Sequence, residues 1–313
     1  MDFALDDTQQ AVAGLTREIL TREPDPDSAW KALAHAGLLT GDDFGVLETA
    51  AVLTEVGRVA APLPALSTLA LGVLPIARCG SPAQQEILAP VATGERTLTA
   101  ALRGAVTVSG ENLLSGKAIG VPHAATADHI LVPAGDTVFL VAPEYTILTR
   151  TYSANDTPEY TVVLDRTPGE ALCDTVDLHR FAVAGACAYG DGLLAGALDL
   201  TAEHVRTREQ FGKPLATFQA VAQQIADVYI ASRTLHLAAW SAIWRLAEGK
   251  DPDEDLAVAA YWLAEEALPA LHTCHHLHGG VGVDASYPLH RYYSTIKDLV
   301  RLLGGVEHRL AAV

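Results

Sequence analysis

The stretch RTREQFGKP (206–214) holds the densest group of side chains that could bind an anionic ligand. An arginine guanidinium can hold a pyrophosphate through a bidentate fork, and an aromatic ring beside it can cover an adenine or flavin edge. The segment offers two arginines, Arg206 and Arg208, and one aromatic residue, Phe211; Phe218 and Gln219 follow a little further on. The alternative is an ordinary helix hairpin in which the arginine makes a solvated salt bridge.

A second candidate segment, LHGGVGV (277–283), overlaps a cluster of histidines at 272, 275, 276 and 278. Glycines allow positive φ and a close backbone approach to a ligand, although an interhelical turn explains them equally well. His272 and His276 share a helical face, which raises a metal site as an alternative. No acidic or cysteine partner stands in an HExxH-like arrangement, so we expect no metal there.

Helices must position both segments. Apolar residues recur at three- and four-residue spacing through residues 1–101, which predicts four or five helices, one of them capped by Ser81. The same periodicity later predicts long helices at about 180–208, 216–248, 254–277 and 288–311. Between the first two of these, the sequence predicts that a helix ends at Gly212 and that the next begins near Thr217.

The middle of the chain has a different character. Between about residues 104 and 175, short β-branched runs alternate with Gly, Pro, Asn and Asp, which predicts a small antiparallel β domain. Helices and strands would alternate in a doubly wound α/β fold, so this order argues against one. We predict a mainly α fold with a small central β domain, divided into residues 1–101, 102–175 and 176–313.

Charge and composition limit the partners and the compartment. The chain has 38 acidic and 21 basic residues and a net charge of −17, so no electrostatic footprint for nucleic acid or an anionic membrane is expected. The start MDFALDDTQQ does not resemble a secretory signal, and no stretch approaches the ~18 apolar residues of a membrane span. We expect a cytoplasmic protein. Its scattered cysteines predict buried thiols, without disulfides or zinc: Cys79, Cys173, Cys187 and Cys274.

Two segments of the last helical block, 181–189 and 256–263, are unusually apolar. Helices that are apolar most of the way round must be covered, either as a central layer or by another subunit. We interpret these segments as an oligomer interface.

Several landmarks in a fixed order give the chain a family resemblance. The most specific are REQFGKPLATFQAVAQQIADVYI (208–230) and LHGGVGVDASYPLHRYY (277–293), preceded by FALDDTQQAVAGL, WKALAHAGLL, LETAAVLTEVGRVAAPLP and LSGKAIGVPHAATADHILVPA. With these, the chain resembles the acyl-CoA dehydrogenase family over most of its length. The resemblance implies a helical amino-terminal domain, a middle β domain, a carboxy-terminal four-helix bundle, and FAD bound across a subunit interface in a tetramer.

The resemblance also implies a reaction and a set of residues. The family removes hydrogen from the α and β carbons of an acyl-CoA thioester, with a carboxylate as base and FAD as hydride acceptor, and passes electrons to an electron-transfer flavoprotein. Six residues match positions that contact FAD: Arg208, Phe211, Gln219, His276, Gly279 and Gly280. His276 stands where the family usually has glutamine, and a neutral imidazole can replace one amide hydrogen bond.

The departures from the family pattern are equally informative. Leu303 occupies the position of the usual catalytic glutamate, and the alternative base position falls near Ala182. Neither residue can accept a proton. Glu307 and Asp191 are the nearby carboxylates, but neither has the family register. The β domain also lacks the family's flavin-contacting segments between residues 101 and 128.

These departures define the expected function. We expect one subunit of a heteromeric acyl-CoA dehydrogenase, an α2β2 tetramer in which a longer related partner supplies the base. Actinobacterial steroid-degrading systems pair two subunits of this family, one of them short and without the base, and this chain resembles that short subunit. Loss of part of the substrate wall would widen the pocket, which suits a fused-ring CoA thioester. Two alternatives remain: a self-sufficient homotetrameric dehydrogenase that uses Glu307 or another carboxylate, and a flavin-free structural partner subunit.

Overall fold

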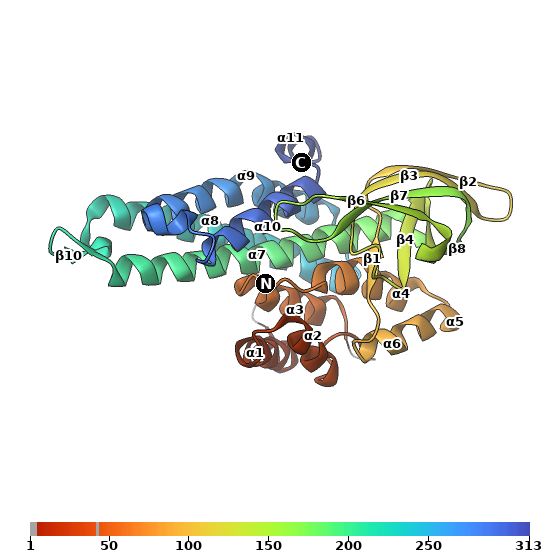
Figure 1. The fold of residues 1–313 in the computed structure, drawn as a ribbon, viewed down its shortest axis with the longest axis horizontal. Helices are drawn as coiled ribbons and strands as arrows, with labels where there is room; N and C mark the ends of the chain where they lie inside the picture. The colour runs from red at the N-terminus through yellow and green to blue at the C-terminus, as the bar shows by residue number, and fades with distance from the viewer. Residues whose placement is uncertain (1–4, 42–43) are drawn as a thin grey trace. The chain divides into compact units, whose positions relative to one another are not determined.

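The structure is a computed structural model that describes residues 5–41 and 44–313. The first residues of the FALDDTQQAVAGL landmark lie outside the described part. Helices come first along the chain, strands follow, and helices return (Figure 1). This order confirms the prediction of a mainly helical fold with a small β region in the middle.

The described chain separates into two compact units. We call residues 7–52 and 62–185 the strand unit, and residues 53–61 and 186–313, with residues 5–6, the bundle unit. Helices α3 (Val46–Arg58) and α7 (Thr175–Thr207) run through the boundaries. The first helices and the strands therefore share one unit, and the division of the chain into three domains stays a prediction.

Short helices open the strand unit. They are α1 (Asp7–Arg22), α2 (Pro26–His35), the start of α3, the π-helix η1 (Leu66–Val73), α4 (Leu74–Cys79), α5 (Pro82–Gln85), η2 (Glu86–Leu88) and α6 (Ala89–Ala92), with η3 (Pro143–Tyr145) further along. Ser81 caps α5 as predicted. Its hydroxyl accepts from the Gln84 amide at 3.3 Å, and the Gln84 side chain accepts from the Ser81 amide at 2.9 Å. This reciprocal pair is a capping box, which fixes where α5 begins.

Two four-stranded sheets form the β region, in the orders β1-β4-β5-β8 and β2-β3-β7-β6. Their strands are β1 (Leu98–Ala100), β2 (Gly104–Ser109), β3 (Leu113–Pro122), β4 (His129–Ala134), β5 (Thr137–Val141), β6 (Ile147–Thr151), β7 (Glu159–Pro168) and β8 (Glu170–Asp174). β1 pairs with β4 in parallel, whereas the other pairs are antiparallel. The prediction of a purely antiparallel domain is wrong at this edge, because β1 comes from the segment that was predicted to be helical.

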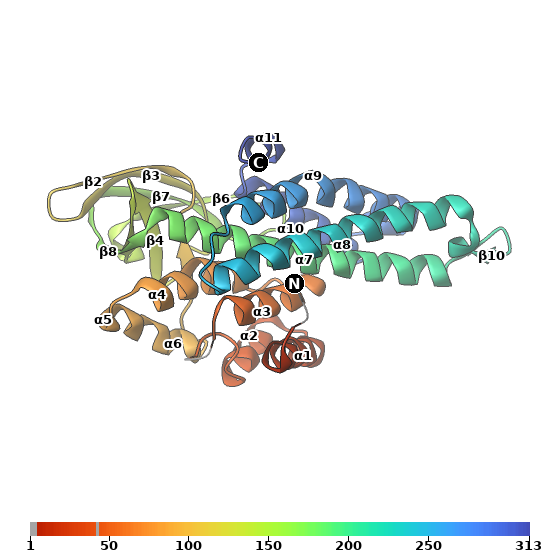
Figure 2. The same ribbon diagram turned by 180° about the vertical axis from the view of Figure 1, so that it is seen from behind.

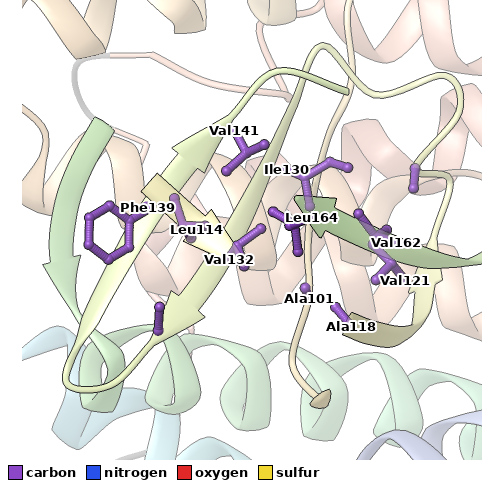
Figure 3. Close-up of a cluster of buried hydrophobic side chains, with 12 residues drawn as sticks. Ala101, Leu114, Ala118, Val121, Ile130, Val132, Phe139, Val141, Val162 and Leu164 are labelled. Carbon is purple, nitrogen blue, oxygen red and sulfur yellow. The ribbon is translucent and has the colours of Figure 1, made fainter. Parts of the chain in front are cut away.

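The two sheets share one apolar core (Figure 3). Leu114 from β3 and Ile130 and Val132 from β4 are fully buried, and Phe139 from β5 and Val162 from β7 lie in the same cluster. Full burial of a side chain of this size contributes roughly 1.5–3 kcal/mol. The strand unit thus has its own hydrophobic core.

Long helices form the bundle unit. They are α7 from residue 186 on, α8 (Gln219–Ala247), α9 (Asp253–His278), α10 (Leu289–Leu302) and α11 (Val306–Leu310). α8 and α9 lie side by side in both views (Figures 1 and 2). Asp255 joins them, because it accepts from Ser241 at 2.6 Å and pairs with Arg245 at 2.8 Å. The predicted single helix at 288–311 is broken at Gly304 and Gly305, where φ is +90° and +84°.

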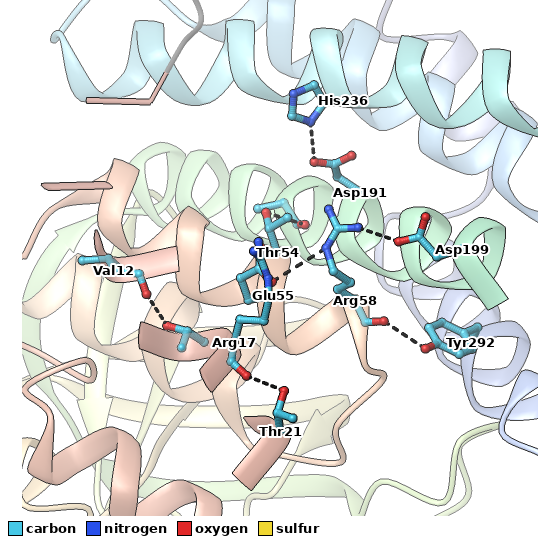
Figure 4. Close-up of polar contacts among 12 residues, drawn as sticks. Val12, Arg17, Thr21, Thr54, Glu55, Arg58, Asp191, Asp199, His236 and Tyr292 are labelled. Atoms are coloured by element: carbon cyan, nitrogen blue, oxygen red, sulfur yellow. Dashed lines mark hydrogen bonds and ion pairs between the residues drawn. The ribbon is translucent and has the colours of Figure 1, made fainter. Parts of the chain in front are cut away.

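Close backbone packing joins the end of α3 to α7. A Cβ on Gly192 would lie 1.9 Å from the Thr54 carbonyl oxygen, and one on Gly196 would lie 1.9 Å from that of Arg58. Polar contacts flank this packing: Arg58 pairs with Asp199 at 3.0 Å, and its carbonyl accepts from the Tyr292 hydroxyl at 2.9 Å (Figure 4). Glycine is required here because no larger residue leaves room for the neighbouring backbone.

The apolar segments of α7 and α9 are largely covered within the chain itself. Ala182 and Ala188 of α7 and Ala260 and Leu263 of α9 are each at most 3% exposed, whereas Val258 of α9 is 40% exposed. These segments therefore contribute to the core of the chain, and their role in an oligomer interface stays a prediction. Among the described residues, α7 is also the one helix long and apolar enough to span a membrane, but 78% of that window is buried inside the protein, as expected of a core helix.

Candidate functional site

The RTREQFGKP segment forms a small hairpin that we call the arginine arm (residues 206–214). α7 ends at Thr207, and the strands β9 (Glu209–Gln210) and β10 (Lys213–Pro214) pair around a Phe211-Gly212 turn. The φ angles of +57° and +77° in this turn are those of a tight hairpin turn. The predicted helix end at Gly212 is therefore wrong, because the last residues pair as strands. The 3-10 helix η4 (Leu215–Thr217) follows, and α8 begins at Gln219.

The arm presents an aromatic ring to solvent. Phe211 is 92% exposed although its backbone adopts the left-handed conformation, which is unfavourable for a residue with a Cβ. The neighbouring Lys213 ammonium lies 4.3 Å from the centre of the Phe218 ring. The turn therefore holds Phe211 outward and leaves its face available to a ligand.

Arg206 and Arg208 differ in what they contact. The Arg206 side chain donates to the Ala202 carbonyl at 3.0 Å and lies 3.9 Å from the Glu203 carboxylate. The Arg208 guanidinium makes no hydrogen bond or ion pair with any residue that the structure describes. Its backbone is nevertheless fixed, because its amide donates to the His204 carbonyl at 2.8 Å and its carbonyl accepts from the Leu215 amide at 2.9 Å. A free guanidinium on a held backbone is prepared to bind an anion.

The second segment is the turn that ends α9, which we call the glycine turn (η5, Gly279–Val283). Gly279 has φ +61° and ψ −138°, a conformation that requires glycine. A Cβ on Gly279 or Gly280 would meet no atom within 4 Å, so open space lies over the backbone. His276 is exposed. The turn can therefore accept a close ligand.

An aromatic stack brings the ends of α7 and α9 together. The rings of His204 and His278 lie with centroids 4.4 Å apart and planes 20° apart. His204 is one helical turn before Arg208, and His278 directly precedes Gly279. The arginine arm and the glycine turn are therefore at the same end of the bundle unit. The sequence analysis grouped the four histidines of α9 but missed His204, because its partner lies 74 positions away.

The residues considered for a catalytic base lie in three different environments. Leu303 is 3% exposed, and its carbonyl accepts from the Arg309 side chain at 2.5 Å. Asp191 is buried, and one of its oxygens accepts from His236 at 2.9 Å (Figure 4). The same oxygen accepts from Trp240 at 3.3 Å. Glu307 is exposed on α11. Asp191 is thus committed to the interior of the bundle.

Two of the cysteines come together in the strand unit. Cys79 at the end of α4 and Cys173 on β8 share a side-chain hydrogen bond and are only half-buried. Burial raises the pKa of Cys173 to about 12, which keeps its sulfur in the thiol form. The prediction of buried thiols is confirmed for Cys187 and Cys274 only. Within residues 5–41 and 44–313, no three His, Cys, Asp or Glu side chains gather as metal ligands.

The residues at this end of the bundle unit suit one half of a dinucleotide. A free guanidinium fits a pyrophosphate, and an exposed ring and an open glycine backbone fit the planar groups beside it. The site is therefore suited to holding a cofactor.

Comparisons with known proteins identify the family. The model of the acyl-CoA dehydrogenase C-terminal domain matches residues 171–309. Acyl-CoA dehydrogenase FadE28 of Mycobacterium tuberculosis is 48% identical, over 99% of this chain and 97% of that protein. The chain belongs to the acyl-CoA dehydrogenase family. FadE27 of the same organism is 34% identical, over 100% of this chain and 98% of its own. Family membership confirms the expected class, an oxidoreductase acting on CH–CH groups.

Solved structures of this family show the same fold. The ChsE4-ChsE5 complex from M. tuberculosis matches with a TM-score of 0.93 and 34% identity, over 99% of this chain and 97% of that one. The Tcur3481-Tcur3483 steroid ACAD G363A variant matches with a TM-score of 0.92 and 32% identity, over 97% and 96%. The first is a complex of two proteins, and the second is described by two protein names. Butyryl-CoA dehydrogenase from Megasphaera elsdenii, 20% identical with a TM-score of 0.86, shares the fold.

Proposed function

We propose that this chain is the cofactor-arm subunit of a heteromeric, FAD-dependent acyl-CoA dehydrogenase. With a longer related subunit it would form an α2β2 tetramer that converts an acyl-CoA thioester to the 2-enoyl-CoA. One observation carries the proposal: the chain presents the unpaired Arg208 on a fixed backbone, yet has Leu303 where the family's base stands. It is equipped to hold a cofactor and not to remove a proton.

Different residues would contact the different chemical groups of FAD. The Arg208 guanidinium would neutralise the pyrophosphate, with Phe211 and the Gln219 amide beside it. Gly279 and Gly280 would let the backbone approach the adenosine half, with His276 giving a hydrogen bond there. FAD, when bound, supplies the acceptor for the hydride that leaves the β-carbon. The electrons would then pass to an electron-transfer flavoprotein.

The base would come from the partner. Removal of the α-proton needs a carboxylate within hydrogen-bond reach of substrate. Leu303 has none, and Asp191 is engaged by His236 and Trp240. The alignment with FadE27 runs over 376 positions, more than the 313 residues of this chain, so this chain carries deletions relative to FadE27. Such shortening is what a subunit that no longer builds a complete active site would show.

Exposed apolar side chains support a protein partner. Tyr229, Ile230 and Leu237 on α8 are 55%, 59% and 50% exposed, and Ile230, Arg233 and Leu237 follow helical spacing along one face. A helix face of this kind is stabilised when another protein covers it. The steroid-type complex among the similar structures supports a steroid side-chain CoA ester as substrate. We place the reaction in the cytoplasm.

The test is to compare this chain purified alone with this chain co-expressed with its candidate partner, a longer acyl-CoA dehydrogenase-family subunit. The proposal predicts little flavin and no dye reduction for the chain alone, and flavin with turnover for the complex. Full flavin and turnover in the isolated chain would instead support the self-sufficient homotetramer. A complex that is active without flavin contacts from this chain would support the structural-partner alternative.

A further inference from the structure

We propose that His204, His278 and Tyr287 form a clamp that positions the glycine turn against the arginine arm. These are positioning residues: they act on the cofactor through Arg208 and Gly279. The inference rests on the proposed function, because it concerns how the FAD half-site is held together.

His278 closes the glycine turn on itself. Its side chain is buried, with the residue 5% exposed. Nδ1 lies 2.8 Å from the Cys274 carbonyl and must donate to it, which leaves Nε2 to accept from the Tyr287 hydroxyl at 3.1 Å. This hydrogen bond spans the whole glycine turn, from the residue before it to the loop after it. The turn is thereby closed at its base.

Tyr287 is itself held in place. Its amide donates to the Asp284 carbonyl at 3.0 Å, and its own carbonyl accepts from His290 Nδ1 at 2.7 Å. The ring centroids of His278 and Tyr287 lie 5.2 Å apart. Tyr287 is therefore a fixed anchor for His278.

His204 connects this closed loop to the arginine arm. Its ring stacks on that of His278 at 4.4 Å, and its carbonyl accepts the amide of Arg208 at 2.8 Å. A shift of the His204 ring in the stack would therefore move the backbone of Arg208 through this hydrogen bond. The clamp sets the spacing between the guanidinium and the glycine backbone, which a bound dinucleotide would have to match.

The clamp works with both imidazoles neutral. Burial lowers the pKa of His278, and its neighbours His204 and His275 lower it further, although the Cys274 carbonyl acts in the opposite sense. Burial lowers the pKa of His204 as well, and so does the Arg208 charge. Burial also lowers the pKa of His275, and the neighbouring His272 and His290 lower it further. A proton on either stacked ring would lie close to the other imidazole, and a proton on His278 would leave its Nε2 unable to accept from Tyr287.

The sign of the pH effect follows from these directions. The folded pKa values lie below the ordinary value of about 6.5, so the folded form binds fewer protons than a relaxed form. The stability of the clamp is complete above about pH 6.5 and is lost as the pH falls below it. Flavin should therefore be held less tightly in mild acid.

The test measures the FAD dissociation constant of the complex at pH 8 and pH 5.5. Tyr287→Phe removes the hydroxyl and keeps the ring, and we expect about three- to tenfold weaker binding at pH 8. Tyr293→Phe is the matched control, because its hydroxyl meets the exposed His272 at 2.9 Å and lies outside the clamp. His204→Phe keeps a stacked ring without a titrating group. We expect its affinity for FAD to fall less between pH 8 and pH 5.5 than that of the wild type.

The two proposals fail in different ways. A wild-type complex that binds no FAD at pH 8 would overturn the proposed function and the clamp with it. A wild-type complex that binds FAD, with Tyr287→Phe indistinguishable from Tyr293→Phe, would overturn the clamp alone. An unchanged pH profile in His204→Phe would also contradict it.

Discussion

The carboxylate of Asp191 and the imidazole of His236 share a 2.9 Å hydrogen bond between α7 and α8. Trp240 donates to the same carboxylate oxygen at 3.3 Å, so this oxygen accepts two hydrogen bonds, and the Asp191 side chain has little access to solvent. The Asp191 carboxylate is thereby a structural group of the bundle.

Asp191→Asn tests this assignment. Loss of the charge weakens the hydrogen bonds from His236 and Trp240, so we expect about 1–2 kcal/mol less stability. Turnover per bound flavin in the complex should be unchanged. Denaturant unfolding and steady-state kinetics measure the two effects, with Glu307→Gln as the control for the second unused carboxylate. A large loss of turnover with flavin retained would make Asp191 the base.

Gly196→Ala tests the packing of α3 on α7. The added Cβ would lie 1.9 Å from the Arg58 carbonyl oxygen, and the backbone would have to separate. We expect a cost of more than about 3 kcal/mol in the free energy of unfolding. Gly14→Ala in α1 is the control, because a Cβ there meets no atom within 4 Å, and a gain of about 0.5–1 kcal/mol is expected. Equal effects of the two changes would contradict the close packing.

His123 should make the strand unit sensitive to acid. Burial lowers the pKa of His123 to about 4, so the unfolded chain, with a pKa of about 6.5, binds the proton first. Stability is therefore lost as the pH falls from about 6.5 towards 4, by about 2.5 kcal/mol at pH 4.5. His123→Asn should remove that part of the loss, since asparagine tolerates the φ of +55° found there.

The measurement is urea unfolding at pH 7 and pH 4.5. His35→Asn, at an exposed position on α2, is the matched control and should lose as much stability in acid as the wild type. If His123→Asn also behaves like the wild type, burial of His123 does not cause the acid sensitivity.

Local sequence signals predicted much of the fold. Long helices gave strong periodicity, and β-branched runs marked β2, β4, β5 and β7. β3 was not predicted, because Gly116 and Gly120 interrupt its β-branched pattern. Both glycines have positive φ and lie beside the two register shifts in the pairing of β3 with β7. β1 has only three residues, too few for a periodic pattern.

Contacts between distant residues could not be predicted from one sequence. Arg208, Phe211 and the glycine pair were found because their types and spacing are local. His204 with His278, Asp191 with His236, and Cys79 with Cys173 meet only after folding, so no local pattern links them. Likewise, composition alone could not tell that the apolar side of α7 faces the core and that exposed apolar residues lie on α8 instead.

The central claim is that Arg208 holds FAD for the complex. The most direct measurement is flavin per tetramer, by absorbance after gel filtration, in complexes that carry Arg208→Ala or Arg206→Ala. Each variant removes one positive charge from the arm, but Arg206 is already engaged by Ala202 and Glu203. We predict that Arg208→Ala loses most of its flavin and that Arg206→Ala keeps the wild-type amount. Wild-type flavin content in Arg208→Ala would contradict the account.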